Sequence, residues 1–126
     1  MGYLHFKDLE IPLYRGSLVI VLTNDNDRLV NILPSFPKDK NIYAHTYYDN
    51  WKGDNGYFII LNFDNNYRKI HNGIITHEAI HATHMIAAQR GFVSDFDNDE
   101  PIAYLAEWIT DQVYKFMDKH KKKASV

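Results

Sequence analysis

The amino-acid sequence predicts an α+β fold, in which a small antiparallel or mixed sheet from the N-terminal half packs on two long C-terminal helices. The first half contains short runs rich in β-branched and aromatic residues, separated by turn-forming clusters. The second half contains two long helical patterns, at residues 70–90 and 100–121. Strands followed by helices, without regular alternation, are typical of this class. At 126 residues the chain is expected to form a single domain.

The strand half is expected to span residues 3–63. Residues 3–7 and 11–15 are short and alternate between apolar and polar side chains, which is compatible with two strands. Residues 17–23, Ser-Leu-Val-Ile-Val-Leu-Thr, form a continuous apolar run. Such a run is typical of a central strand that is buried on both faces.

The middle of the chain contains a less regular pattern and then a hairpin. Residues 24–27, Asn-Asp-Asn-Asp, predict a turn, and residues 28–33 fit either a short strand or a helical turn. Residues 41–48 and 57–63 predict two further strands. The segment between them, 49–56, is rich in Asp, Asn and Gly, so the two strands are predicted to form a hairpin.

The first helical pattern contains His77-Glu78-Ala79-Ile80-His81, an HExxH sequence. Two imidazoles four residues apart project from the same face of a helix. A zinc ion lies about 2.0–2.1 Å from each such nitrogen, so it can sit between the two rings. Glu78 lies about 100° around the helix, beside the metal. That position suits a general base acting on a metal-bound water.

The surroundings of this motif predict a buried helix. Residues 74–88 are apolar on nearly every side, and Gly91 provides a natural end to the helix. Burying two histidines and a glutamate without partners is costly. A metal ion with a water molecule removes that cost, so the context favours a zinc site over two ordinary histidines.

A catalytic zinc site requires a third protein ligand. The downstream candidates are His84, Asp95, Asp97, Asp99, Glu100 and Glu107. His84 shares the histidine face but lies a further turn along, so three rings do not converge easily on one tetrahedral ion. Glu100 follows His81 by 19 residues, which is enough for the helix to end, a loop to turn and a second helix to begin. We therefore favour Glu100.

The second helical pattern begins near Glu100-Pro101, because proline is tolerated in the first turn of a helix. This helix is expected to be amphipathic. Its polar residues fall within about a 60° arc: Glu100, Tyr104, Glu107 and Asp111. Its apolar residues lie opposite: Ile102, Leu105, Ala106, Ile109 and Val113. The polar stripe is either a solvated face or a metal-facing one. In the second case Glu107 or Asp111 would accept a hydrogen bond from a ligand imidazole.

The HExxH sequence followed by Asn98-Asp99-Glu100 on a second helix resembles the gluzincin metallopeptidases, over residues 70–116. In length the chain is similar to their minimal single-domain forms, the minigluzincins. The resemblance implies His77, His81 and Glu100 as zinc ligands and Glu78 as the base. It also implies an edge strand that holds an extended peptide.

One position departs from the larger gluzincins. They commonly carry an aspartate four residues after the ligand glutamate, bonded to a ligand histidine, and this chain has Tyr104 there. Tyr104 is therefore a candidate for a different role. The developing oxyanion of a peptide hydrolysis needs a second electrophile besides the metal. Tyr104, His84 and His45 are the candidates for it.

The sequence thus predicts zinc-assisted peptide hydrolysis. Zinc lowers the pKa of its water toward about 7, and Glu78 takes the proton and passes it to the leaving amine. One alternative is a non-catalytic zinc-containing module that binds a peptide or protein on the same scaffold. The other is a small scaffold whose histidines are incidental.

Composition limits the partners that we expect. A net charge of −2 argues against nucleic acid, and the absence of cysteine excludes a disulfide framework or a thiolate zinc site. No apolar run reaches transmembrane length, and the first residues lack the layout of a signal peptide. The expected partner is therefore a peptide or protein substrate, with no membrane and a cytoplasmic location.

Overall fold

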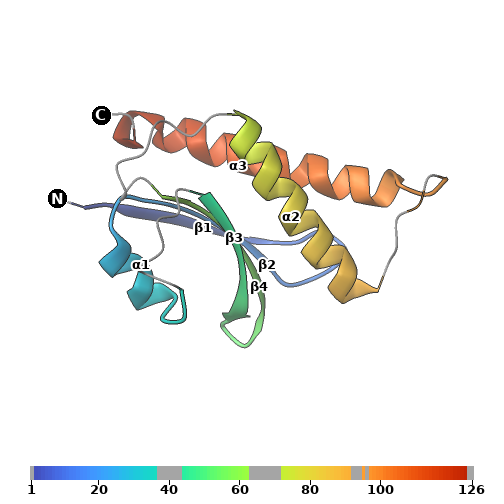
Figure 1. Cartoon of the computed structure of the whole chain (residues 1–126), viewed down its shortest axis with the longest axis horizontal. Helices are drawn as coiled ribbons and strands as arrows, with labels where there is room; N and C mark the ends of the chain where they lie inside the picture. The colour runs from blue at the N-terminus through green and yellow to red at the C-terminus, as the bar shows by residue number, and fades with distance from the viewer. Residues whose placement is uncertain (1, 37–43, 63–71, 92–94, 96, 125–126) are drawn as a thin grey trace.

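The computed structural model describes residues 2–36, 44–62, 72–91, 95 and 97–124. The predicted α+β class is confirmed, with four strands in the N-terminal half and two long C-terminal helices (Figure 1). A third, short helix lies between the second and third strands. The elements are β1 (Leu4–Glu10), β2 (Ser17–Thr23), α1 (Asn26–Ile32), β3 (Ala44–Trp51), β4 (Asp54–Asn62), α2 (Asn72–Arg90) and α3 (Glu100–Ala124).

The strands form one mixed sheet in the order β1-β2-β4-β3. The central strands β2 and β4 are parallel, and each pairs with an antiparallel edge strand, β1 with β2 and β3 with β4. Both central strands are buried along most of their length. This explains their continuous apolar sequences, and it confirms the central strand predicted at residues 17–23.

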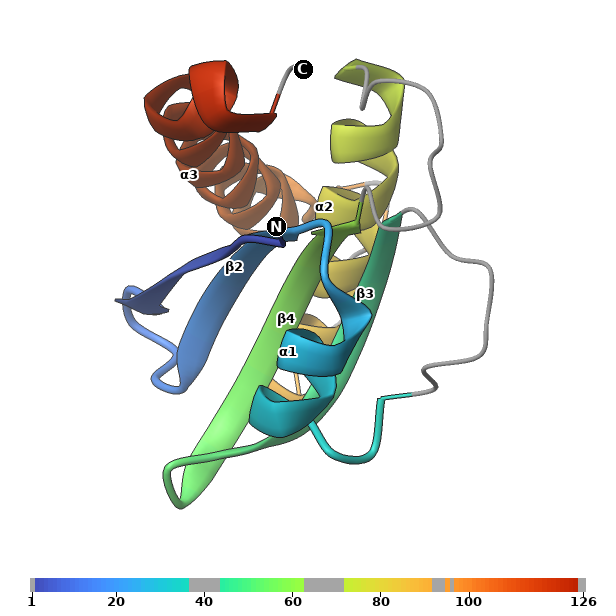
Figure 2. The same cartoon turned by 90° about the vertical axis from the view of Figure 1, so that its left-hand side faces the viewer.

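Helices cover both faces of the sheet, α1 on one and α2 with α3 on the other (Figure 2). The two-residue period of a strand divides the side chains of β2 and β4 between two cores. The core toward α2 and α3 includes Leu18, Ile20, Leu22, Tyr57, Ile59 and Leu61. The core toward α1 includes Val19, Val21, Phe58 and Ile60. Each fully buried aliphatic side chain contributes roughly 1.5–3 kcal/mol.

The β3–β4 hairpin is tighter than predicted. Only Lys52 and Gly53 connect the strands, with φ angles of 54° and 84°. Positive φ at both positions is typical of a type I′ turn, whose twist matches that of the strands. The predicted connection at residues 49–56 is therefore too long, because its outer Asp, Asn and Gly residues are paired in the ladder.

The strand predicted at residues 11–15 is wrong, because these residues form the loop between β1 and β2. The register pairs Glu10 with Ser17, so the chain must reverse its direction between them. The amide of Ile11 donates to the carbonyl of Gly16 at 3.0 Å, which closes the loop. Within it Leu13 and Arg15 have positive φ angles of 69° and 61°. A strand excludes that backbone region.

Residues 28–33, which fitted a short strand or a helical turn, belong mainly to α1. The Asp25 carboxylate accepts a hydrogen bond from the Arg28 amide at 3.2 Å and caps the helix. The predicted turn at residues 24–27 therefore also provides the start of the helix. Leu29 and Leu33 pack under it against the sheet.

Helix α2 agrees with its predicted range within the described residues, which do not include 70–71. Helix α3 begins at the predicted Glu100 but ends at Ala124, beyond the predicted end at residue 121. Gly91 follows α2 with a φ of 75°, as expected for a residue that ends a helix. On α3 the predicted apolar side is confirmed, because Leu105, Ile109 and Val113 are buried in the shared core.

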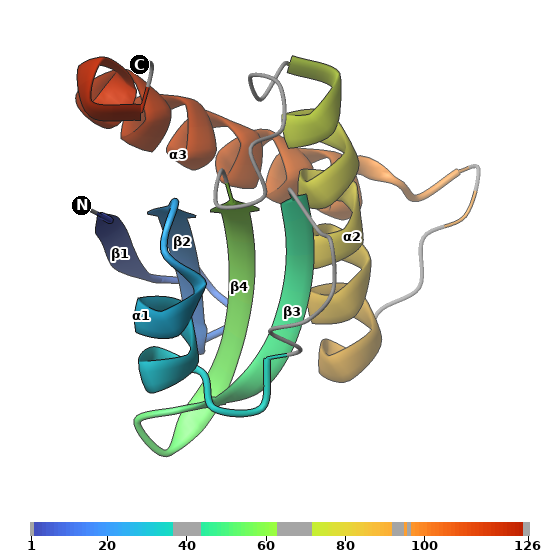
Figure 3. The same ribbon diagram turned by 60° about the vertical axis from the view of Figure 1, so that its left-hand side comes forward.

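The prediction that α2 is buried on nearly every side is wrong. The sheet and α3 cover one side of the helix, where Ile75, Ala79 and Ile86 are buried. Its opposite side carries exposed residues, and Ile80 keeps 46% of its surface exposed. The helix runs beside edge strand β3 (Figure 3). It therefore presents its outer side to solvent.

Candidate functional site

His77 and His81 lie one turn apart on the exposed side of α2. Their Nε2 atoms are 3.1 Å apart, and the ring planes are inclined at 80°. Two nitrogens bound to one tetrahedral zinc ion at 2.0–2.1 Å lie about 3.3–3.4 Å apart. The two imidazoles therefore already converge at nearly the separation that a shared metal ion requires.

Glu78 lies in a different environment from the histidines on either side of it. Its side chain is only 6% exposed and faces edge strand β3. The hydroxyl of Thr46 donates to Glu78 Oε1 at 2.7 Å, and Thr46 Oγ1 also lies 3.0 Å from the backbone carbonyl oxygen of Glu78. A hydrogen bond to a carboxylate is stronger than one between neutral groups. The contact therefore orients the carboxylate at the boundary between α2 and the sheet.

Edge strand β3 directs backbone groups outward beside this carboxylate. In a two-residue hairpin the residues flanking the turn, Trp51 and Asp54, form a hydrogen-bonded pair. Hydrogen-bonded and non-hydrogen-bonded pairs alternate along an antiparallel ladder. The N–H and C=O groups of Thr46, Tyr48 and Asn50 therefore point away from β4. The Asn50 N–H donates to the Asp49 carboxylate at 2.7 Å, whereas the outward groups of Thr46 and Tyr48 can pair with an extended peptide at this edge of the sheet.

The described residues do not complete a zinc site. No group of three histidine, aspartate or glutamate side chains that could hold a metal ion occurs among them. All six candidates for the third ligand are exposed in this part of the chain: His84, Asp95, Asp97, Asp99, Glu100 and Glu107. The histidine pair thus fits zinc, but the structure does not bring Glu100 to it.

The geometry of the two helices explains this separation. On α3 the polar stripe lies opposite the buried Ile109 and Val113, so Glu100, Glu107 and Asp111 face solvent. On α2 the histidines lie likewise on the side opposite the core. Two helices that share a core through their apolar sides direct their polar sides away from each other.

The three candidate electrophiles lie in different places. Tyr104 is 65% exposed and lines a groove beside the β1–β2 loop. His45 lies on the α1 side of the sheet, with its ring centroid 6.0 Å from that of Phe36. His84 is exposed on the histidine side of α2, one turn beyond His81. Of the three, His84 alone lies on the same side of the same helix as the pair.

Thr46 is the site residue that sequence reasoning missed. It is 5% exposed and sits on the side of β3 that faces α2. The sequence of β3 contains a signal, because Thr46 is a small polar residue between Ala44 and Tyr48 on the same face of the strand. Its partner, however, is 32 residues away in sequence, so only the tertiary structure identifies the contact.

The C-terminal end of α2 is also anchored to the sheet. The hydroxyl of Tyr57 on β4 donates to Gln89 Oε1, and burial raises the pKa of Tyr57. The guanidinium of Arg90 donates to the carbonyl of Arg15 at 3.2 Å. Together with Thr46 and Glu78, these contacts fix the helix that carries the histidines at two points along its length.

Comparisons with known proteins add no family to these observations. No protein-family model, curated protein or solved structure matches the chain. A search of the described helices finds none with the length and apolar character needed to cross a bilayer. The residues of α2 and β3 themselves are therefore the basis for a function.

Proposed function

We propose that this chain is a zinc-dependent peptide hydrolase in which His77 and His81 hold the metal and Glu78 is the general base. The observation that carries the proposal is the 3.1 Å separation of the two Nε2 atoms, with Glu78 between them in sequence and fixed against the sheet. When bound, zinc supplies Lewis acidity, which lowers the pKa of a coordinated water.

Glu78 would move the proton in this reaction. A carboxylate can accept a proton from the attacking water and donate it to the leaving amine. Thr46 occupies Oε1 and restricts rotation of the carboxylate, which leaves Oε2 for proton transfer. Thr46 is thus a positioning residue in this scheme, because it acts through Glu78.

Edge strand β3 would hold the substrate. The outward N–H and C=O groups of Thr46 and Tyr48 offer hydrogen bonds to an extended peptide. Because the Thr46 side chain touches Glu78, a peptide paired along this edge passes beside the base. The expected substrate class is therefore an unfolded or extended segment, rather than a compact protein surface.

Glu100 is the third ligand that we propose. It is the first residue of α3, and the first turn of a helix has amide groups without intrahelical partners. That turn can rearrange while Leu105 and Ile109 keep their buried positions. Metal binding can stabilise such a rearrangement, because the free energy of binding is coupled to local folding.

A second function is supported by the burial of Glu78. A carboxylate that is 6% exposed and bonded to Thr46 also fits a purely structural bridge between helix and strand. The same edge strand would then bind peptides without cutting them. In that case the chain is a zinc-containing peptide-binding module.

Substitution of Glu78 by glutamine separates the two functions. Gln is close to isosteric and keeps a hydrogen-bond acceptor for Thr46, but it cannot take the proton. We expect Glu78→Gln to retain zinc and to cut peptides roughly 100-fold or more slowly, within the range measured for general bases. The measurement is mass-spectrometric digestion of a peptide library, with zinc content determined on the same samples.

The matched control is Glu10→Gln, which changes an exposed carboxylate at the end of β1. It should digest the library at close to the wild-type rate. Cleavage by Glu78→Gln at the wild-type rate would show that the base is a different residue. Peptides retained but uncut by both wild type and Glu78→Gln would favour the binding module.

A further inference from the structure

Asp49 lies where the outward backbone groups of edge strand β3 stop being available. Its half-buried carboxylate accepts two hydrogen bonds, from the Asn50 amide at 2.7 Å and from the Ser35 hydroxyl at 3.0 Å. The Asn50 amide is one of the outward groups of β3, so the carboxylate itself lies along the outer edge of the strand. A peptide that pairs with Thr46 and Tyr48 therefore meets this carboxylate at the place where its pairing ends.

The charge of Asp49 remains available to a substrate. Lys52, the neighbouring cation in the hairpin, lies 3.7 Å from the Asp8 carboxylate, so its ammonium faces β1. The two groups that contact Asp49, the Ser35 hydroxyl and the Asn50 amide, are neutral donors. They hold the carboxylate in place without cancelling its charge. The edge that would hold the substrate thus ends in an oriented negative charge.

We propose that Asp49 selects substrates with a cationic group, an inference that rests on the hydrolase function proposed above. The Thr46 side chain contacts Glu78, so the substrate residue opposite Thr46 lies next to the bond that is cut. Asp49 follows Thr46 by three residues, which is about 10 Å along an extended strand. The cation therefore belongs at the third or fourth residue from the cut. Facing residues of paired strands project to the same side of a sheet, so this residue projects to the side of Asp49.

Two parts of a peptide can supply this cation. One is the side chain of a lysine or arginine within the chain, and the other is the α-ammonium of a peptide that begins at this position. Both pair with a carboxylate through charged N–H donors. Acetylation of the N-terminus removes the second source, so acetylated and free peptides distinguish the two.

Cleavage of matched peptides tests the proposal. The parent is an N-acetylated peptide that the wild type cuts, remade with either lysine or norleucine at each of the four residues on both sides of the cut. Lysine should raise kcat/KM about five-fold over norleucine at one position, the third or fourth from the cut, which corresponds to the upper end for an exposed ion pair. A norleucine peptide with a free N-terminus at that position should show the same increase if the α-ammonium is recognised.

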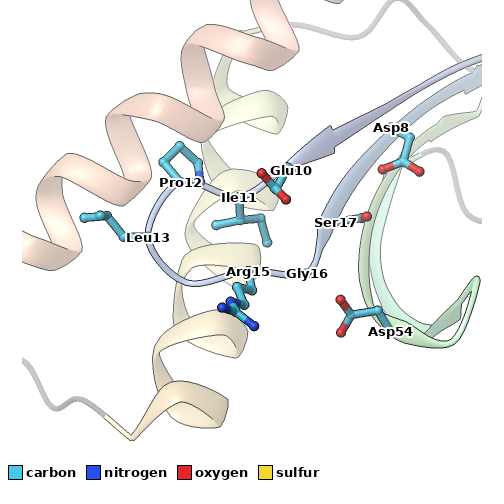
Figure 4. A pocket seen from close by; sticks show the side chains of 9 residues that line it. All are labelled: Asp8, Glu10, Ile11, Pro12, Leu13, Arg15, Gly16, Ser17 and Asp54. Atoms are coloured by element: carbon cyan, nitrogen blue, oxygen red, sulfur yellow. The ribbon is translucent and has the colours of Figure 1, made fainter.

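Asp49→Asn removes the charge but keeps an acceptor for the Asn50 amide, so its Tm should stay close to that of the wild type. The variant should cut the lysine and norleucine peptides with equal kcat/KM. Asp54→Asn is the matched control, because Asp54 accepts the Asn55 amide at 2.7 Å in the same way. Asp54 begins the inner strand β4 and lines the hollow beside the β1–β2 loop (Figure 4). Its substitution should leave the preference for lysine unchanged.

The outcomes separate this inference from the hydrolase function. Equal cleavage of lysine and norleucine peptides by the wild type would overturn the role of Asp49 and leave the hydrolase function intact. A preference for lysine that survives Asp49→Asn, or that is lost equally in Asp54→Asn, would do the same. A wild type that cuts no peptide of the library would instead overturn the hydrolase function, and the inference with it.

Discussion

His77 and Glu78 are neighbours in the chain but occupy opposite environments. The imidazole is exposed, while the carboxylate is buried against Thr46. The step of about 100° per residue in an α-helix produces this difference at the place where α2 meets the edge of the sheet. The arrangement suits a site in which the metal ligands are accessible and the base keeps one orientation.

At the residue scale, substitution of Glu100 tests the proposed third ligand. We expect Glu100→Ala to weaken zinc binding by more than about 100-fold, which exceeds the loss typical of residues that only support a ligand. Asp95→Ala and Asp97→Ala remove exposed carboxylates from the segment before α3 and should have smaller effects. Competition with a chelator ranks the three variants. A larger loss from Asp95→Ala or Asp97→Ala would assign the ligand to that segment and exclude the gluzincin arrangement.

At the scale of elements, we propose that the outward backbone groups of strand β3 hold the substrate. Proline lacks an N–H, so Tyr48→Pro removes one outward donor while leaving the ladder to β4 intact. We expect the KM for an extended peptide to rise several-fold, with a small change in Tm.

Two controls isolate this effect. Tyr48→Ala removes the same side chain, including its hydroxyl contact with Asn55, but keeps the N–H. Tyr47→Pro removes a donor that points into the ladder and should lower Tm strongly. Equal KM values for Tyr48→Pro and Tyr48→Ala would show that this edge does not bind the peptide.

The elements that sequence patterns predicted best are those with a strong local signal. The apolar run of β2 and the 3.6-residue period of α3 each appear at their predicted positions. The loop at residues 11–15 was mistaken for a strand because alternation alone does not reveal the positive φ of Leu13. The burial of α2 was overestimated because an apolar composition does not specify how many neighbours cover a helix.

At the scale of the whole molecule, the candidate site lies where the exposed side of α2 meets the outward backbone groups of edge strand β3. The HExxH spacing predicted that His77 and His81 would converge, because that geometry is local to one helix. Thr46 and the placement of Glu100 depend on how α2 packs against β3 and α3. Sequence spacing contains no such information, so the third ligand stays a proposal.

Zinc content, measured by elemental analysis after expression in zinc-supplemented medium, tests the central claim most directly. The account predicts about one zinc ion per chain in the wild type and essentially none in His81→Ala, because one histidine does not retain the metal. His84→Ala, which changes an exposed imidazole one turn further along the same helix, should keep its zinc. A wild type without zinc, or a His81→Ala variant with the full wild-type amount, would contradict the account.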